Sequence, residues 1–118
     1  MRYVDGFLIP VPKKNLRAYR RNAQAAGRIW KKMGALEYCE TVGEDLAQGN
    51  IVPFTKASKA KPSETVIFSW IVYRSRADRD RVNARVLMDP VILKMMKAKS
   101  PFDVKRMVYG GFRMLVDM

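Results

Sequence analysis

Asp5 is the residue of this sequence that fits least well with its neighbours. It lies in the middle of Tyr3–Ile9, an apolar segment that we predict to be a strand. A carboxyl group buried there without a partner has a raised pKa and can act as a general acid or base. The alternative is that Asp5 pairs with a lysine or arginine, or caps backbone groups at a strand edge. The sequence leaves both interpretations open.

Further polar and aromatic residues in the predicted strands suit the lining of a cavity for a small organic molecule, between paired sheets. The candidate cavity-lining residues are Asp5, Tyr38, Ser69, Trp70, Tyr73, Tyr109 and Arg113. An enzyme that works without a cofactor on a small organic molecule is one function that such a cavity supports. A module that only binds the molecule is the other, and we assign no catalytic residue.

The composition excludes several kinds of chemistry. The chain has no histidine and one cysteine, which excludes a histidine-assisted nucleophile and argues against a zinc or copper site. No glycine-rich phosphate loop is present, because the glycines at Tyr109–Gly111 lack a following lysine and helix. We predict no metal and no cofactor. The single cysteine, Cys39, cannot form an internal disulfide, so we expect a cytoplasmic protein.

A second functional hypothesis rests on charge. The net charge is +12, and eight basic residues of a predicted helix fall on one side of it with no acid among them. This candidate basic patch consists of Lys13, Lys14, Arg17, Arg20, Arg21, Arg28, Lys31 and Lys32. It is either a solvated face that aids solubility or a contact surface for RNA or an acidic partner. No RNA-binding or DNA-binding motif accompanies it.

The elements that must position these residues follow from hydrophobic spacing and from capping residues. In the first helix one apolar stripe is predicted from residues spaced three and four apart, which are Leu16, Tyr19, Ala23, Ala26, Trp30 and Met33. Ser75 and Asp89 are the predicted caps of the two later helices. With 118 residues we expect one domain over 1–118. The predicted elements, in order, are strand Tyr3–Ile9, helix Lys13–Met33, strand Ala35–Val42, a basic loop 46–63 with an extended piece at Ile51–Phe54, strand Thr65–Tyr73, a helix from Ser75 to before Pro90, a short helix through Met96, and strand Met107–Val116. This is a βαββαβ order with additional pieces.

The strand Thr65–Tyr73, with the sequence TVIFSWIVY, is apolar on both faces. Side chains alternate along a strand, so Phe68 and Trp70 point to one side and Ile71 and Tyr73 to the other. A nearly continuous apolar run indicates that both faces are covered. Because the chain has few helices, we expect a second copy of the chain to cover the second face.

Four segments resemble the YbaA-like family of small bacterial proteins, a domain of unknown function. They are YVDGFLIPVPKKNLRAYR, GALEYCETVGED, KAKPSETVIFSWIVYRSRADRDRVNA and KRMVYGGFRMLVD, and together they span Arg2 to Asp117. The resemblance implies an α+β fold, a ferredoxin-like βαββαβ subunit that pairs sheet to sheet into a dimeric α+β barrel. It implies no activity, because the family itself is uncharacterised.

From these observations we expect a cytoplasmic homodimer that pairs through its sheet faces and is not inserted in a membrane. The first functional interpretation is a small-molecule-binding or accessory module. The alternatives are a cofactor-independent enzyme acting in a sheet-lined cavity, and a binder of RNA or an acidic partner through the basic patch.

Overall fold

The computed structural model describes residues 1–47 and 49–118. The described elements, in order, are β1 (Tyr3–Pro12), a 3-10 turn (Lys13–Asn15), α1 (Leu16–Met33), β2 (Glu37–Val42), α2 (Phe54–Ala57), β3 (Glu64–Tyr73), α3 (Arg76–Val86), α4 (Pro90–Lys97), a second 3-10 turn (Val104–Arg106) and β4 (Val108–Arg113). This order confirms the predicted βαββαβ subunit, to which α2 and α4 are added.

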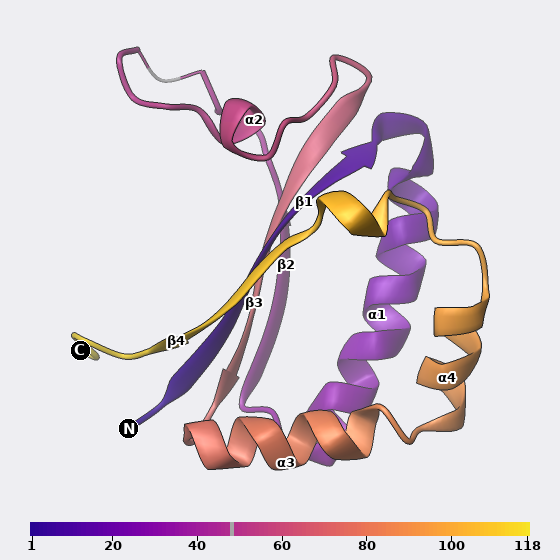
Figure 1. The fold of residues 1–118 in the computed structure, drawn as a ribbon, viewed down its shortest axis with the longest axis vertical. Helices are drawn as coiled ribbons and strands as arrows, with labels where there is room; N and C mark the ends of the chain where they lie inside the picture. The colour runs from indigo at the N-terminus through magenta and orange to yellow at the C-terminus, as the bar shows by residue number, and fades with distance from the viewer. Residues whose placement is uncertain (48) are drawn as a thin grey trace.

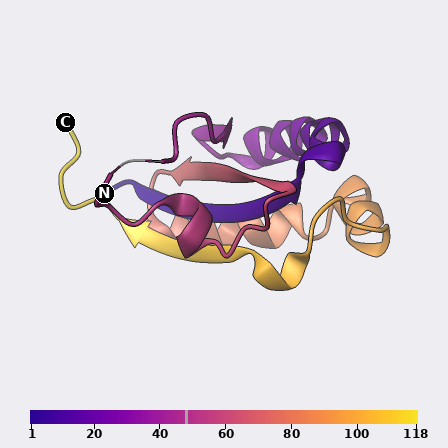
Figure 2. The same ribbon diagram turned by 90° about the horizontal axis from the view of Figure 1, so that it is seen from above.

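The strands form one antiparallel sheet in the order β2-β3-β1-β4. Figure 1 views this sheet nearly edge-on, with α1 and α4 to its right and α3 across its lower end, where Val82 and Val86 of α3 pack with Ile71 and Tyr73 of the sheet. Seen from above in Figure 2, the one-turn α2 lies apart from these three helices. The three long helices therefore cover one face of the sheet, which confirms the predicted α+β, ferredoxin-like arrangement.

The strand register separates the residues of the two faces. Residues paired across neighbouring strands share a face, and Phe68 pairs with Leu8 while Ile71 pairs with Asp5. The face without the three helices is called the open face below. It carries Val4, Gly6, Leu8, Glu37, Cys39, Thr41, Val66, Phe68, Trp70, Val72, Val108, Gly110 and Phe112.

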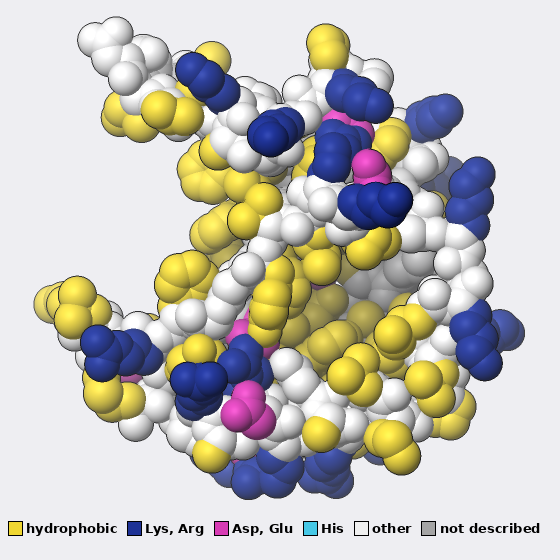
Figure 3. Space-filling model, in the orientation of Figure 1, with side chains coloured by type: hydrophobic (Ala, Val, Ile, Leu, Met, Phe, Trp, Pro, Cys, Tyr) yellow, Lys and Arg dark blue, Asp and Glu magenta, His cyan; other side chains and the backbone are white. Residues whose placement is uncertain are grey.

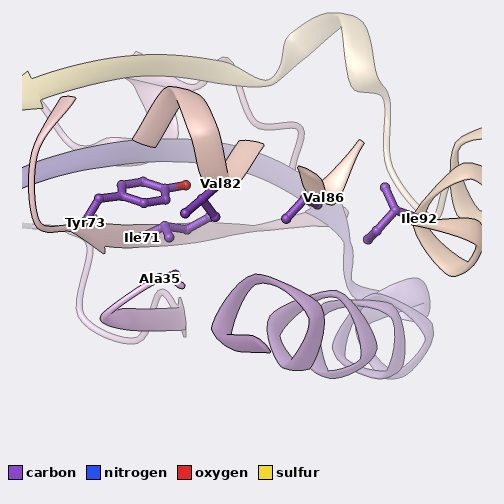
Figure 4. Packing of buried hydrophobic residues seen from close by; sticks show 6 residues of the cluster. All are labelled: Ala35, Ile71, Tyr73, Val82, Val86 and Ile92. Carbon is purple, nitrogen blue, oxygen red and sulfur yellow. The ribbon is translucent and has the colours of Figure 1, made fainter. Parts of the chain in front are cut away.

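The hydrophobic core lies between the sheet and its helices. One cluster joins β3 to α3 and α4, and a second joins β1 and β3 to α1. Figure 4 shows the residues of the first cluster, which are Ala35, Ile71, Tyr73, Val82, Val86 and Ile92. Burying each valine or isoleucine side chain of this cluster stabilises the fold by about 1.5–3 kcal/mol.

Helix α1 follows the predicted apolar stripe closely. Tyr19 is buried and Ala23, Ala26 and Trp30 are half-buried against the sheet, as the spacing of three and four residues predicts. The helix ends at Gly34, whose φ of 126° lies in the region that favours glycine. The first three residues of the predicted helix, Lys13–Asn15, form a 3-10 turn instead of α-helix.

The predicted caps of the two later helices are present. The Asp78 backbone N–H donates to Ser75 Oγ at 3.0 Å and starts α3. The Val91 N–H donates to Asp89 Oδ1 at 2.8 Å, and Pro90 occupies the first turn of α4. These caps fix where α4 begins and hence how it covers the sheet.

Four segments differ from their predicted form. The first strand continues through Pro10 to Pro12 rather than ending at Ile9. The last strand ends at Arg113 rather than Val116, and the second begins at Glu37 rather than Ala35. In the loop 46–63, of which residue 48 lies outside the described residues, the structure has a helical turn where we expected the extended piece to end. Phe54 begins that turn, and its ring lies 5.8 Å from the ring of Phe68 on the open face.

The two ends of the described chain are held together at one corner of the molecule, as Figure 1 shows. Arg2 Nη2 donates to Asp117 Oδ1 at 2.6 Å, and Arg2 Nε donates to Asp117 Oδ2 at 2.9 Å. Among the described residues, the helices are too short or too polar for any of them to cross a membrane.

Candidate functional site

A cavity of about 550 Å³ lies between the helix-covered face of the sheet, α1, α4 and the segment 98–107. Figure 3 shows hydrophobic side chains gathered in the hollow between the sheet and these helices. The apolar lining includes Phe7, Ile9, Ala26, Trp30, Ile71, Ile92, Met95, Phe102 and Met107. The polar lining includes Tyr19, Asn22, Tyr38, Glu40, Ser69 and Ser100. An apolar hollow with a few polar groups is the usual form of a small-molecule site.

Local sequence explains the walls of this cavity. In α4, residues 92 and 95 are three apart and face the sheet together, which places Ile92 and Met95 in the wall. The ring of Phe102 packs edge-on against Tyr19 with a centroid distance of 5.7 Å. Arg106, in the second 3-10 turn, forms an ion pair with Glu64 at the start of β3. This pair ties the segment 98–107 to the sheet.

Glu40 is held between two tyrosine hydroxyls at the cavity wall. The Tyr19 hydroxyl donates to Glu40 Oε1 at 2.6 Å, and the Tyr38 hydroxyl donates to Oε2 at 2.8 Å. Burial raises the pKa of Tyr19 and Tyr38 far above the ordinary value, and the charge of Glu40 raises both further. The two phenols therefore stay protonated and act as donors. A carboxylate so placed can accept a hydrogen bond or a proton from a bound molecule.

A second depression, of about 850 Å³, lies on the outer side of the same three residues and is called the α1–β2 groove below. The groove and the cavity share Tyr19, Ala23, Tyr38 and Glu40 in their walls. The groove is otherwise lined by Leu16, Arg20, Gln24, Gly27, Arg28, Lys31, Thr41, Val42 and Ile67. The hydrogen-bonded group of Tyr19, Glu40 and Tyr38 is thus the partition between the cavity and the groove.

Gly27 allows α1 to approach β2 closely at this partition. A Cβ atom on Gly27 would lie 2.7 Å from Cδ1 of Tyr38, which is too close for carbon atoms that are not bonded. The absent side chain leaves room for the Tyr38 ring against the helix. The backbone of α1 therefore fixes the ring whose hydroxyl holds Glu40.

Asp5 lies in a separate polar network. Its side chain is 1% exposed, and Arg79 Nη1 donates to Asp5 Oδ1 at 2.8 Å. The same Nη1 donates to the Tyr109 hydroxyl at 2.8 Å, and Asn83 Nδ2 donates to Asp5 Oδ2 at 3.5 Å. Of the two interpretations of Asp5, the structure shows the pairing with a basic residue. Its charge is thereby compensated within the fold.

Asn83 connects this network to the cavity wall. Its Oδ1 accepts from the Tyr73 hydroxyl at 3.0 Å and from Trp30 Nε1 at 3.1 Å. Burial, followed by the charge of Asp5, raises the pKa of Tyr73 above its ordinary value. The indole of Trp30 lies between the network and the cavity, so the network supports the wall from behind.

The residues predicted from the sequence to line a cavity are placed in four different environments. Tyr38 and Ser69 line the cavity, whereas Asp5, Tyr73 and Tyr109 belong to the network behind it. Trp70 borders the cavity, but its ring is on the open face, with its centroid 5.6 Å from that of Phe68. Arg113 is exposed at the end of β4, and the cation on Asp5 is Arg79.

Two residues of the site were not singled out as functional in the sequence. Tyr19 was assigned only to the apolar stripe of the first helix, and Glu40 was not considered. A signal for Glu40 was available, because it shares a strand face with Tyr38 two residues away and that face is the buried one. An acidic residue on the covered face of a strand is the same feature that drew attention to Asp5.

The predicted basic patch is exposed along the outer side of α1. Within the described residues, none of its eight members lies within ion-pair distance of a carboxylate. Lys31 Nζ donates to the Leu36 carbonyl oxygen at 2.7 Å, and Arg20, Arg28 and Lys31 border the groove. In the same part of the chain, no group of three or more histidine, cysteine or acidic side chains is placed to hold a metal ion.

Comparison with solved structures identifies the fold. The chain superimposes on Rv0793 from Mycobacterium tuberculosis with a TM-score of 0.62 and 14% identity, over 99% of this chain and 98% of that one. A putative antibiotic biosynthesis monooxygenase from Nitrosomonas europaea gives 0.59 and 11%, over 97% and 90%. A dimeric ferredoxin-like protein from an uncultured marine organism gives 0.57 and 13%, over 99% and 96%. These similarities establish a ferredoxin-like α+β subunit.

Sequence comparison identifies the family. The chain is 42% identical to the uncharacterized protein YbaA of Escherichia coli K12 over 117 residues, which cover 99% of both chains. Residues 2–104 match the family described as protein of unknown function (DUF1428). The resemblance noted in the sequence is confirmed, and the chain belongs to the DUF1428 family.

Proposed function

We propose that the protein is a homodimer in which two open faces pack together to form an α+β barrel. The observation that carries this proposal is the apolar character of the open face. On this face Phe68 is 46% exposed, Val108 49% and Phe112 61%. Exposed apolar side chains gathered on one face of a sheet are of the kind that marks an interface.

The chain surrounds the open face with further apolar residues. Phe54 of α2 contacts Phe68 from one end, and Leu115 and Val116 extend beyond β4 at the other. Figure 3 shows hydrophobic side chains along this hollow side of the molecule, between the two projecting segments. The dimeric ferredoxin-like protein from an uncultured marine organism gives further support.

The oligomeric state of a matched pair of variants tests the dimer. Phe68→Asp places a charge on the open face, whereas Leu93→Asp places one on the exposed side of α4. We expect light scattering after gel filtration to give a dimer for the wild type and Leu93→Asp, and a monomer for Phe68→Asp. A monomeric wild type at micromolar concentration would contradict the proposal.

We further propose that the cavity binds a small, mainly apolar organic molecule whose polar group contacts Glu40, and that it does so in the cytoplasm. The volume of about 550 Å³ supports this, since ligand sites usually measure about 300–1,000 Å³. Ser69 lines the cavity, and its hydroxyl is a polar group with which a ligand can pair. The lone Cys39 favours a reducing compartment.

A neutral fluorescent probe, N-phenyl-1-naphthylamine, tests the cavity. Ala26→Phe fills the cavity from α1, and Ala84→Phe adds the same ring to an exposed position of α3. We expect the wild type and Ala84→Phe to bind one probe per chain, and Ala26→Phe to bind at least tenfold more weakly. Equal affinities of the two variants would place the probe elsewhere and refute the cavity as the site.

Catalysis by Glu40 is a second proposal, favoured by the position of its carboxylate in the cavity wall between two phenol donors. The Nitrosomonas protein described as a putative antibiotic biosynthesis monooxygenase suggests oxygen uptake as the reaction to test. The apolar cavity with the Glu40 acceptor in its wall suits a compound that carries a hydroxyl group on an aromatic ring. We expect oxygen uptake with such a compound to be lost in Glu40→Gln while probe binding remains. Equal uptake by the wild type and Glu40→Gln would remove Glu40 from the reaction.

A further inference from the structure

The charge inside the cavity is opposite in sign to the charge of the chain. The chain has 23 lysines and arginines and a net charge of +12. Among the described residues that line the cavity, none is a lysine or arginine, and Glu40 is the only charged side chain. The α1–β2 groove differs, because Arg20, Arg28 and Lys31 border it. The cations near the partition thus lie on its outer side, and the cavity presents a single acid.

Glu40 has no cation to balance its charge. In the part of the chain that the structure describes, no lysine or arginine lies within ion-pair distance of its carboxylate. The hydroxyls of Tyr19 and Tyr38 supply two hydrogen bonds, and both phenols are neutral. A carboxylate has about four lone-pair sites, so about two remain for another donor. A half-buried carboxylate gains more from a charged donor than from a neutral one.

Two pairs of aromatic rings adjoin this carboxylate. The centroid of the Trp30 ring lies 6.0 Å from that of Tyr38. The centroid of the Phe102 ring lies 5.7 Å from that of Tyr19. All four rings belong to residues that line the cavity. The face of an aromatic ring attracts a cation, most strongly where water is excluded, so rings and a carboxylate around one apolar hollow suit an organic ammonium ion.

We propose that the ligand of the cavity is an organic amine that binds as its ammonium ion. Its N–H groups donate to the free lone pairs of Glu40, and its apolar body packs against Ile92, Met95 and the aromatic rings. An amine ligand presupposes the proposed cavity site and defines the class of molecule that the site selects. The cavity lies between the sheet and its helices, so the pairing of two open faces does not fill it.

The observations favour an amine over an acid or an alcohol. A carboxylic acid would bring a second negative charge to a cavity whose described lining has no cation. An alcohol could donate to Glu40 but would leave its charge unbalanced. The net charge of +12 acts in the opposite direction, since long-range attraction favours anions. A preference for the amine would therefore come from the cavity and not from the overall charge.

Three naphthalene compounds of similar size and different charge test the ligand class. They are 1-naphthylmethylamine, 1-naphthylmethanol and 1-naphthoic acid, and titration calorimetry at pH 7 measures the binding of each directly. We expect the amine to bind at least tenfold more tightly than the alcohol, and the acid to bind most weakly. An alcohol or acid that binds as tightly as the amine, or an amine that does not bind at 1 mM, would overturn the proposal.

The probe N-phenyl-1-naphthylamine, which is uncharged at pH 7, separates the ligand class from the cavity itself. Its binding to the wild type, and the loss of binding in Ala26→Phe, depend on the cavity and not on a positive charge. Probe binding without a preference for 1-naphthylmethylamine would reject only the ammonium ion as ligand. Failure of both compounds to bind would reject the cavity as the site.

Two variants with the same charge change test the role of Glu40. Glu40→Gln removes the charge in the cavity wall, whereas Glu44→Gln removes one at an exposed position outside the cavity. We expect Glu40→Gln to weaken binding of 1-naphthylmethylamine at least tenfold and Glu44→Gln to leave it unchanged. Binding of 1-naphthylmethanol should change less than threefold in both variants, which shows that the cavity is intact. Equal affinities of the two variants for the amine would overturn the proposal.

Discussion

Asp5 and Glu40 are carboxylates on the same covered face of one sheet, yet their surroundings differ. Asp5 is 1% exposed and is paired with Arg79, so its charge is balanced within the fold. Glu40 is half-buried, is held by two neutral phenols and borders both the cavity and the groove. The difference separates a carboxylate that stabilises the fold from one that is available for binding or chemistry.

The largest expected effect is the loss of the buried ion pair in Asp5→Asn. Removing one partner of a buried pair leaves the other charge uncompensated, so we expect the free energy of unfolding to fall by about 3–5 kcal/mol. Asp80 also contacts Arg79, through Nε at 2.8 Å, but its side chain is 62% exposed. Asp80→Asn is the matched control, and in urea unfolding at one protein concentration it should change little. Similar losses in the two variants would contradict the special role of Asp5.

The pair between Glu64 and Arg106 extends the comparison to acid stability. Hydrogen bonding to Arg106 lowers the pKa of Glu64 to about 2, below its value in the unfolded chain. The unfolded chain therefore binds an additional proton between about pH 4.5 and pH 2, and the stability that Glu64 contributes is lost as the pH falls through this window. We expect Glu64→Gln to be less stable than the wild type at pH 7 and to show a shallower decline in melting temperature from pH 4.5 to 2. Parallel declines would show that other carboxylates dominate.

Glu40→Gln should have a smaller effect on stability than Asp5→Asn. Its amide retains one acceptor for the two phenols and leaves no cation unpaired, so we expect a loss of about 1 kcal/mol in urea unfolding. Tyr19→Phe and Tyr38→Phe should each cost a similar amount. A loss in Glu40→Gln as large as that in Asp5→Asn would reverse the assignment of structural and functional roles to the two carboxylates.

The smallest effect on stability is expected for basic residues that have no acidic partner in the part of the chain that the structure describes. The triple variant Arg17→Glu, Arg21→Glu and Arg28→Glu relieves repulsion worth a few tenths of a kcal/mol for each like-charged pair. Its melting temperature should stay the same or rise slightly, while its affinity for heparin should fall strongly. A large decrease in melting temperature would mean that these arginines make stabilising contacts.

Local patterns in the sequence were sufficient for most of the fold. The spacing of Tyr19, Ala23 and Trp30 predicted the covered side of α1, and Ser75 and Asp89 predicted the starts of α3 and α4. Such signals lie within a few residues and depend little on distant parts of the chain. Strand ends were less accurate, because they depend on pairing partners rather than on the strand itself.

The site was only partly predictable because its contacts join distant segments. Asp5 and Arg79 are 74 positions apart, and Tyr19 and Glu40 are 21 apart. An aspartate in an apolar strand needs a partner, which the sequence indicates for Asp5. The sequence does not indicate which of the 23 lysines and arginines is that partner. The cavity itself is formed by α4 and the segment 98–107 in positions that no local pattern specifies.

The close spacing between α1 and β2 depends on the missing side chain at one position, Gly27. Every glycine codon becomes an alanine codon by one base change, and the added methyl group would strike the Tyr38 ring. The ring could make room only by turning or by moving away from the helix, and either change would displace the hydroxyl that holds Glu40. A single base change at this codon would therefore alter the spacing between α1 and β2 and the position of Glu40 in the partition. The shapes of the cavity and of the α1–β2 groove would change together.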